Sequence, residues 1–181
     1  MCFSKANNFV VVGFINVEIK ARCDDPDKIE KILKEKGADY KGTDHQVDTY
    51  FRVSEGRLKL REGQIENALI CYNRKNTVGP KVSEVLLYKT NPGSSLKQIL
   101  EKSLKVLTVV DKKRKIFFIG HVKFHIDRVQ GLGEYVEIEV IDREGTMTKE
   151  NLQEECEYYM HELGIRAEDL ESRSYSDLLM K

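Results

Sequence analysis

The sequence HVKFHIDRVQGLGEYVEIEVI, residues 121–141, decides which kind of fold this chain forms. Apolar and polar residues alternate over 121–129 and again over 134–141, and the segment between them contains Gly131 and Gly133. Alternation with a period of two is typical of a β-strand that has one apolar and one polar face. Two such runs joined by a short glycine-containing turn predict a pair of antiparallel strands.

Similar strand-like segments occupy much of the preceding chain. They are residues 11–22, 47–53, 57–62, 66–75, 83–90 and 108–119. Three amphipathic helices are predicted between and after them: one from Asp25-Pro26 to Gly37, one over 96–104 and one over 148–163. Eight strands joined mostly by short turns can close into a barrel that has no open edge. We therefore predict an α+β fold, an eight-stranded antiparallel β-barrel with the helices packed outside it.

The charge composition limits the classes of function. The 181 residues include 30 basic and 30 acidic side chains, so the formal net charge is zero. This balance argues against stable nucleic-acid binding and against binding to anionic membranes, because such proteins usually carry net positive charge. Charged residues nevertheless make up 33% of the chain, against about 25% in a typical protein. Where these charges lie is therefore the main question.

The chain is expected to form one domain over residues 1–181, in which residues 1–13 lead into the first strand. No apolar run approaches the roughly 18 residues that a membrane-spanning helix requires, and no linker or repeat divides the sequence. The four cysteines, at positions 2, 23, 71 and 156, are scattered and form no zinc-binding spacing. We expect reduced thiols and a cytoplasmic location.

Charged residues share one face of most predicted strands. By strand parity the sets are Glu18, Lys20 and Arg22; Arg57, Lys59 and Arg61; Arg74 with Tyr72; Lys112 and Arg114; Lys123, His125 and Asp127; Glu137 and Glu139. Alternation alone favours solvated outer faces over an apolar core. The three helices, however, need an apolar sheet surface to cover, which favours charge inside the barrel. A charged interior would suit a polyanion, bound by Arg and Lys, together with Mg²⁺ or Mn²⁺, bound by carboxylates. Periodicity does not choose between the two orientations.

An ordered set of motifs resembles the CYTH superfamily, the triphosphate tunnel metalloenzymes, and in particular its branch similar to class IV adenylyl cyclases and thiamine triphosphatases. The motifs are NVEIKAR at 16–22, DTYF at 48–51, RLKLR at 57–61, GPKVS at 79–83, KKR at 112–114, HIDRVQGLGEYVEIE at 125–139 and SYSDLL at 174–179. The resemblance implies an antiparallel tunnel whose lumen is lined by acidic and basic side chains. It also implies a divalent cation, Mg²⁺ or Mn²⁺, and a small-molecule triphosphate as substrate.

The resemblance also assigns expected roles inside the tunnel. Glu18, Glu137 and Glu139 are the expected metal ligands, and these three together with Lys20 are the expected catalytic residues. The expected phosphate-binding residues are Lys20, Lys59, Arg61, Arg74, Lys112, Arg114, Lys123 and His125. For His125, pairing with Asp127 is an equal alternative, and Tyr50 and Tyr72 are expected to pack and hydrogen-bond within the wall.

One position departs from the family pattern. The opening motif of the family is Glu-x-Glu-x-Lys, and here Asn16 stands at the first glutamate. An amide oxygen can still bind a metal, but the site has one negative charge fewer. This departure keeps three functions open: a metal-dependent hydrolase of a small triphosphate, a class IV-type adenylyl cyclase that makes cyclic AMP from ATP, and a module that binds polyphosphate or nucleotide without turnover.

Overall fold

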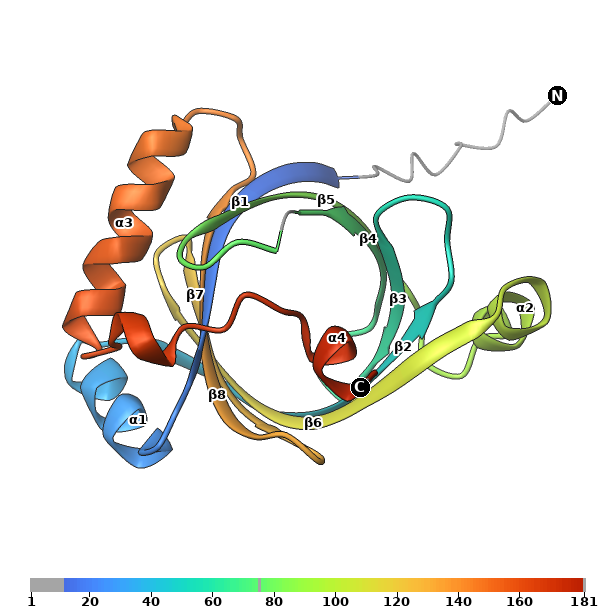
Figure 1. Ribbon diagram of the computed structural model, residues 1–181, viewed down its shortest axis with the longest axis horizontal. Coiled ribbons are helices and arrows are strands. Elements are labelled where there is room, and N and C mark those ends of the chain that lie inside the picture. Colours follow the sequence, from blue (N-terminus) through green and yellow to red (C-terminus); the bar gives the residue numbers. More distant parts are fainter. Residues whose placement is uncertain (1–11, 75, 181) are drawn as a thin grey trace, which may run out of the picture.

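A computed structural model describes residues 12–74 and 76–180. Eight antiparallel strands close into a barrel in the order β1-β5-β4-β3-β2-β6-β7-β8. The strands are β1 (Val12–Arg22), β2 (Asp39–Phe51), β3 (Arg57–Glu62), β4 (Ala68–Asn73), β5 (Lys81–Lys89), β6 (Val106–Ile119), β7 (Val122–Val129) and β8 (Gly133–Asp142). Figure 1 looks through the ring of strands from one end. The predicted fold class is confirmed.

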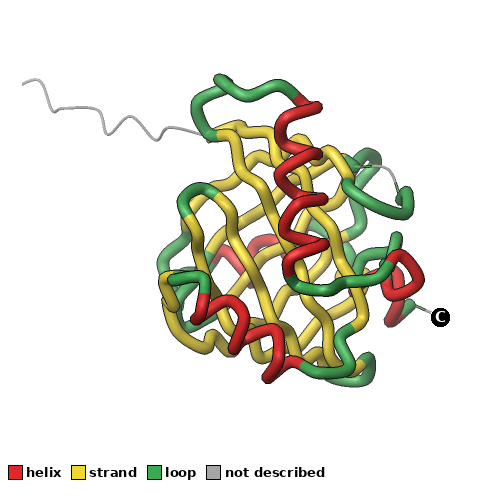
Figure 2. Tube along the Cα trace, turned by 90° about the vertical axis from the view of Figure 1, so that its left-hand side faces the viewer, coloured by secondary structure: helices red, strands yellow, loops and turns green. Residues whose placement is uncertain are grey.

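Helices α1 (Pro26–Glu35) and α3 (Lys149–Glu162) cover one side of the barrel from outside. Figure 2 shows them lying across the outer faces of the strands. Asp25 caps α1 by accepting from the backbone N–H of Lys28 at 3.0 Å, and Pro26 is the first helical residue, as its fixed φ favours. Beneath the helices lies an apolar core between them and β1, β7 and β8, which includes Val17, Phe124 and Ile138.

The position of this core settles the orientation of the strands. The apolar residues of β1, β7 and β8 point outward onto α1 and α3, so their alternate residues, the charged ones, must point into the barrel. The strand register brings the inward residues level across neighbouring strands: Glu18 lies opposite Glu139, and His125 lies opposite Glu137.

The C-terminal segment closes part of one end of the barrel. Helix α4 (Tyr175–Leu179), preceded by the short 3-10 helix η1 (Ala167–Asp169), lies inside the ring of strands in Figure 1. The Tyr175 hydroxyl donates to Asp127 at 2.9 Å, and Arg57 binds Asp177 at 3.0 Å. Sequence periodicity does not predict these two helices, because five and three residues are too few to show a helical period.

Two further details differ from the predictions. Strand β2 begins at Asp39 rather than at residue 47. Its polar first half was not predicted as strand because it lacks strict alternation, and it includes Gly42, which lies at a register shift against β6. Helix α2 (Leu96–Ser103) is present, but no residue of it is buried, unlike α1 and α3. No helix among residues 12–74 and 76–180 combines the length and apolarity that crossing a membrane requires. The predicted lead-in, residues 1–13, lies mostly outside the described residues.

Candidate functional site

The barrel encloses a cavity of about 620 Å³. Among the described residues, nine basic and five acidic side chains line it, an excess of four positive charges in a chain whose net charge is zero. The basic residues are Lys20, Lys59, Arg61, Arg74, Lys89, Lys112, Arg114, Lys123 and Arg143. The acidic residues are Glu18, Asp48, Glu66, Glu137 and Glu139. An enclosed basic surface of this kind favours a small polyanion as ligand.

Asp48 on β2 gathers three of the cations. Its carboxylate accepts from Lys59 Nζ at 3.0 Å, from Lys112 Nζ at 2.8 Å and from Arg61 Nε and Nη2 at 2.9 and 3.0 Å. Burial opposes ionisation of this carboxyl, but Arg61, Lys112 and Lys59 outweigh that effect and hold the pKa of Asp48 well below its usual range. Asp48 therefore holds the three cations close together.

Glu66 holds a second set of cations. Its Oε2 accepts from Arg61 Nη1 at 2.8 Å and from Gln46 at 3.1 Å, and its Oε1 binds Lys123. Burial opposes its ionisation, but Lys123 and Arg61 lower the pKa of Glu66 far below the ordinary value. Asp48 and Glu66 thus share Arg61, which joins β2, β3 and β7 through one hydrogen-bond network.

A third network of ion pairs is centred on Glu137 of β8. Glu137 accepts from Arg114 Nη2 at 2.6 Å and pairs with Lys20 Nζ at 3.3 Å. Arg114 is also bidentate to Asp127, which in turn accepts from Tyr175 of the C-terminal helix. Burial disfavours the charge of Glu137, yet Arg114 and Lys20 hold its pKa well below the usual value.

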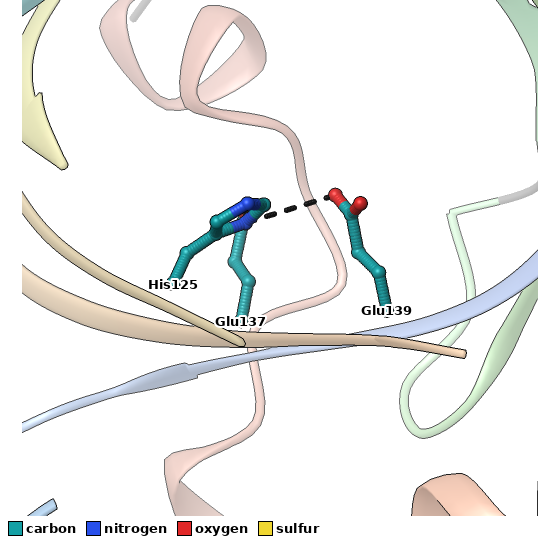
Figure 3. Close-up of side chains that lie close together, drawn as sticks. All are labelled: His125, Glu137 and Glu139. Carbon is teal, nitrogen blue, oxygen red and sulfur yellow. Dashed lines mark hydrogen bonds and ion pairs between the residues drawn. The ribbon is translucent and has the colours of Figure 1, made fainter. Parts of the chain in front are cut away.

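His125, Glu137 and Glu139 form a compact group of donor atoms on β7 and β8. One ligand atom from each lies within 4.8 Å of the others. His125 Nδ1 is 3.3 Å from Glu137 Oε2 and 3.8 Å from Glu139 Oε1 (Figure 3). Burial, Arg114 and Lys123 lower the pKa of His125, so the ring is neutral at neutral pH. The structure does not pair His125 with Asp127, since Asp127 binds Arg114 and Tyr175.

The opening strand contributes less to this group than the family pattern implies. Glu18 lines the cavity, but its carboxylate forms an ion pair with Arg74 and is not part of the group around His125. Asn16, in the place of the first family glutamate, is 4% exposed, and its Oδ1 has no hydrogen-bond partner among the described residues. Ser83 lies opposite Asn16 on β5, and its hydroxyl is likewise buried without a partner in that part of the chain.

Most of the site residues expected from the sequence lie in the lumen. Ten of the eleven line the cavity; His125 is completely buried beside Glu137. Four residues that were not among the expected site residues take part in these networks: Asp48, Glu66, Asp127 and Tyr175. Asp127 was expected only as an alternative partner of His125. Asp48 shares strand parity with Tyr50, which was a usable signal. Glu66 lies in the loop before β4, but it falls within the predicted strand 66–75 and there shares the parity of Tyr72 and Arg74.

Another part of the cavity wall is apolar. Phe14, Ile70, Val85, Leu87 and Ile141 line it on β1, β4, β5 and β8. Tyr50 and Tyr72 also line the cavity, and they hydrogen-bond to each other as expected for wall residues. The lumen therefore offers a charged surface for phosphate and an apolar surface for an organic group.

Lys112 gives a testable protonation change. Burial, together with Arg61 and Arg114, lowers the pKa of Lys112 to about 7, although Asp48 opposes this shift. At pH 8 the empty protein therefore holds this amine mostly neutral, and a bound polyanion favours the ammonium form. We expect tripolyphosphate binding at pH 8 to take up as much as about one proton. Calorimetry in two buffers of different ionisation enthalpy measures this uptake.

The neighbouring lysine is the matched control for that experiment. Lys112→Met is expected to abolish the uptake, whereas Lys113→Met, on the exposed outer face of the same strand, is expected to preserve it. Equal binding enthalpies for the unaltered protein in both buffers would show that Lys112 does not change its protonation state.

Known proteins that resemble this chain have the same fold. The family model of the CYTH domain matches residues 15–175. A proposed adenylate cyclase of Methanocaldococcus jannaschii is 26% identical over 91% of this chain and 98% of its own length. The PH1012 protein of Pyrococcus horikoshii has the same fold, with a TM-score of 0.77 and 24% identity over 90% of this chain and 98% of that one.

A proposed adenylyl cyclase of Hippeastrum, HpAC1, which is described as having a dominant triphosphatase activity, is a more distant structural neighbour. Its TM-score is 0.57, with 17% identity over 91% of this chain and 93% of its own. Since the family model spans residues 15–175 of 181, this chain belongs to the CYTH domain family.

Proposed function

We propose that this protein is a divalent-metal-dependent hydrolase that removes the terminal phosphoryl group of a small triphosphate, such as tripolyphosphate, thiamine triphosphate or a nucleoside triphosphate. One observation carries the proposal: a single enclosed cavity presents cations from β1, β3, β5, β6 and β7 together with two carboxylates from β8. A triphosphate with a divalent cation bound to it is complementary to both surfaces. The triphosphatase activity ascribed to the Hippeastrum protein supports this proposal.

The basic side chains would bind and orient the phosphates. The proposed phosphate-binding residues are Lys20, Lys59, Arg61, Arg74, Lys112, Arg114 and Lys123, with His125 behind them. Asp48, Glu66 and Glu137 already hold most of these groups in place, so binding requires little rearrangement. Positioned cations also stabilise the charge that develops on the transferred phosphoryl group.

The carboxylates fit a divalent cation. Glu137 and Glu139 supply oxygen donors on one face of β8, close to a neutral imidazole, and hard oxygen ligands suit Mg²⁺ and Mn²⁺. A divalent cation held there would neutralise part of the charge of the bound phosphates. Glu137 and Glu139 would hold it, while Glu18 and Lys20 complete the proposed catalytic set from the adjacent strand β1.

A class IV-type adenylyl cyclase is the second candidate. The Methanocaldococcus jannaschii relative, which bears that name, matches over 98% of its length. The apolar wall of Phe14, Val85, Leu87 and Ile141 also offers a surface for the organic part of ATP. In this reaction the ribose 3′-hydroxyl attacks the α-phosphorus, and pyrophosphate leaves.

A substrate panel distinguishes the candidates. Tripolyphosphate, thiamine triphosphate and ATP are each incubated with the protein in Mg²⁺ and in Mn²⁺. Phosphate release supports the hydrolase, cyclic AMP with pyrophosphate supports the cyclase, and tight binding without any product identifies a binding module and contradicts both.

A variant of the metal-binding carboxylate tests the site itself. We expect Glu139→Gln to lower turnover by at least about 100-fold, because altering even a group that only supports a metal ligand costs 10- to 100-fold. Glu84→Gln, on the exposed outer face of β5, is the control and is expected to keep full activity. Undiminished turnover in Glu139→Gln would contradict the proposed metal site.

A further inference from the structure

Three donor atoms face one another at adjacent positions of β7 and β8. His125 lies directly opposite Glu137 in the strand register, and Glu139 is the next residue on the same face. The Nδ1 atom of His125 is 3.3 Å from Glu137 Oε2 and 3.8 Å from Glu139 Oε1. Figure 3 shows the three side chains on the same side of their strands, with the imidazole facing the Glu139 carboxylate.

These separations suit a shared cation. Donors at neighbouring corners of an octahedral ion lie about 3 Å apart when each bond is about 2.1 Å long. The observed separations of 3.3 and 3.8 Å need only a small contraction to reach this geometry. Arg114 occupies one side of Glu137 Oε2, but each carboxylate oxygen has two lone pairs, so a position for a metal remains.

Strand β1 supplies few ligands for a metal at this group, so another strand can supply one. The Glu18 carboxylate is paired with Arg74 and lies outside the group of three. Asn16 lines the same cavity but provides only a neutral amide in place of a carboxylate, and its buried Oδ1 has no hydrogen-bond partner among the described residues. The chain therefore brings fewer charged oxygens to the metal from β1 than the family pattern does, and a donor on β7 can take their place.

The imidazole is buried with one ring nitrogen directed at the two carboxylates. His125 has no exposed surface, and its Nδ1 lies within 3.8 Å of an oxygen of both Glu137 and Glu139, whereas its Nε2 has no hydrogen-bond partner among the described residues. The nitrogen directed at the two carboxylates is Nδ1, whose lone pair is available when the ring proton is on Nε2.

We propose that His125 binds the divalent cation directly through Nδ1, so that the metal centre consists of one imidazole on β7 and two carboxylates on β8. The inference rests on the proposed metal-dependent function and specifies its ligands. Mg²⁺ prefers oxygen ligands, whereas imidazole binds later divalent ions of the first transition row increasingly well. The mixed site therefore favours Mn²⁺ and Co²⁺ over Mg²⁺.

Pulsed electron paramagnetic resonance of the Mn²⁺-loaded protein tests the ligand without any turnover. A directly bonded nitrogen gives a ¹⁴N coupling, and growth with ¹⁵N-histidine replaces it by a ¹⁵N coupling. The chain has four histidines, and the other three, His45, His121 and His161, have largely exposed side chains. A variant with these three changed to Gln keeps His125 and the buried core, and it is expected to retain the coupling.

The complementary variant is His125→Gln, with His121→Gln as its control. We expect His125→Gln to lose the coupling and to bind Mn²⁺ about 10- to 100-fold more weakly, with a smaller change for Mg²⁺, while His121→Gln changes neither. Calorimetry with each metal alone measures both affinities. Mn²⁺ binding without a nitrogen coupling in the unaltered protein would overturn the inference but leave the proposed function standing. If neither metal bound, the proposed metal-dependent function would fail together with it.

Discussion

Replacing Asp48 by Asn is expected to destabilise the empty protein by about 3–5 kcal/mol at pH 6, the usual cost of removing one partner from a buried ionic group. Asp48 is 1% exposed and is the shared partner of Lys59, Arg61 and Lys112. The neutral amide leaves three adjacent cations without their counterion. Urea denaturation of the variant and of the unaltered protein measures the difference in the free energy of unfolding.

The pH dependence of this loss identifies its cause. Lys112 already has a pKa of about 7 in the presence of Asp48, and losing the carboxylate lowers that pKa further. Between that lower pKa and about pH 7, the folded variant has released this proton whereas the folded unaltered protein still holds it, so the free energy of unfolding rises more steeply with pH for the variant than for the unaltered protein. The destabilisation is therefore expected to be smaller at pH 9 than at pH 6.

Ligand and control measurements complete the test. Tripolyphosphate is expected to raise the Tm of Asp48→Asn more than that of the unaltered protein, because the bound anion replaces the missing counterion. The control is Asp111→Asn, which removes an exposed carboxylate on β6 that pairs with His45 on β2. It is expected to change the free energy of unfolding by less than about 0.5 kcal/mol. Equal effects of the two substitutions would show that the cations do not depend on Asp48.

Lys59→Met is expected to weaken triphosphate binding by about 10- to 150-fold, which corresponds to the loss of one charge-assisted contact of about 1.5–3 kcal/mol. The ammonium group of Lys59 lines the cavity, lies 3.0 Å from Asp48 and is near the rings of Tyr50 and Tyr72. Methionine keeps most of the side-chain volume, and Arg61 and Lys112 still neutralise Asp48. We therefore expect the fold to survive and the loss to appear in affinity.

Isothermal titration of tripolyphosphate into both proteins measures this change. Lys113→Met removes a lysine from the exposed outer face of the barrel and is expected to leave the dissociation constant within about twofold, since exposed charges interact only weakly with a ligand inside the lumen. An unchanged dissociation constant in Lys59→Met would contradict an anion-binding lumen.

Local sequence determined the strands and the principal helices. Strand β3 occupies residues 57–62 as predicted, because its alternation is strict and turn residues border it on both sides. Helix α1 begins where Asp25 and Pro26 predict. Alternation also established which residues share a face, so the grouping of Lys59 with Arg61 and of Glu137 with Glu139 followed from the sequence alone.

Only the tertiary structure decided which face points inward and which charges meet. A strand alternates identically whether its polar face lies toward solvent or toward the lumen, and it is the packing of α1 and α3 on β1, β7 and β8 that turns the charges inside. Likewise, Asp48 meets Lys112 and Glu66 meets Lys123 across 64 and 57 residues of chain. Such distant contacts depend on barrel closure and strand register, and no local pattern in the sequence encodes them.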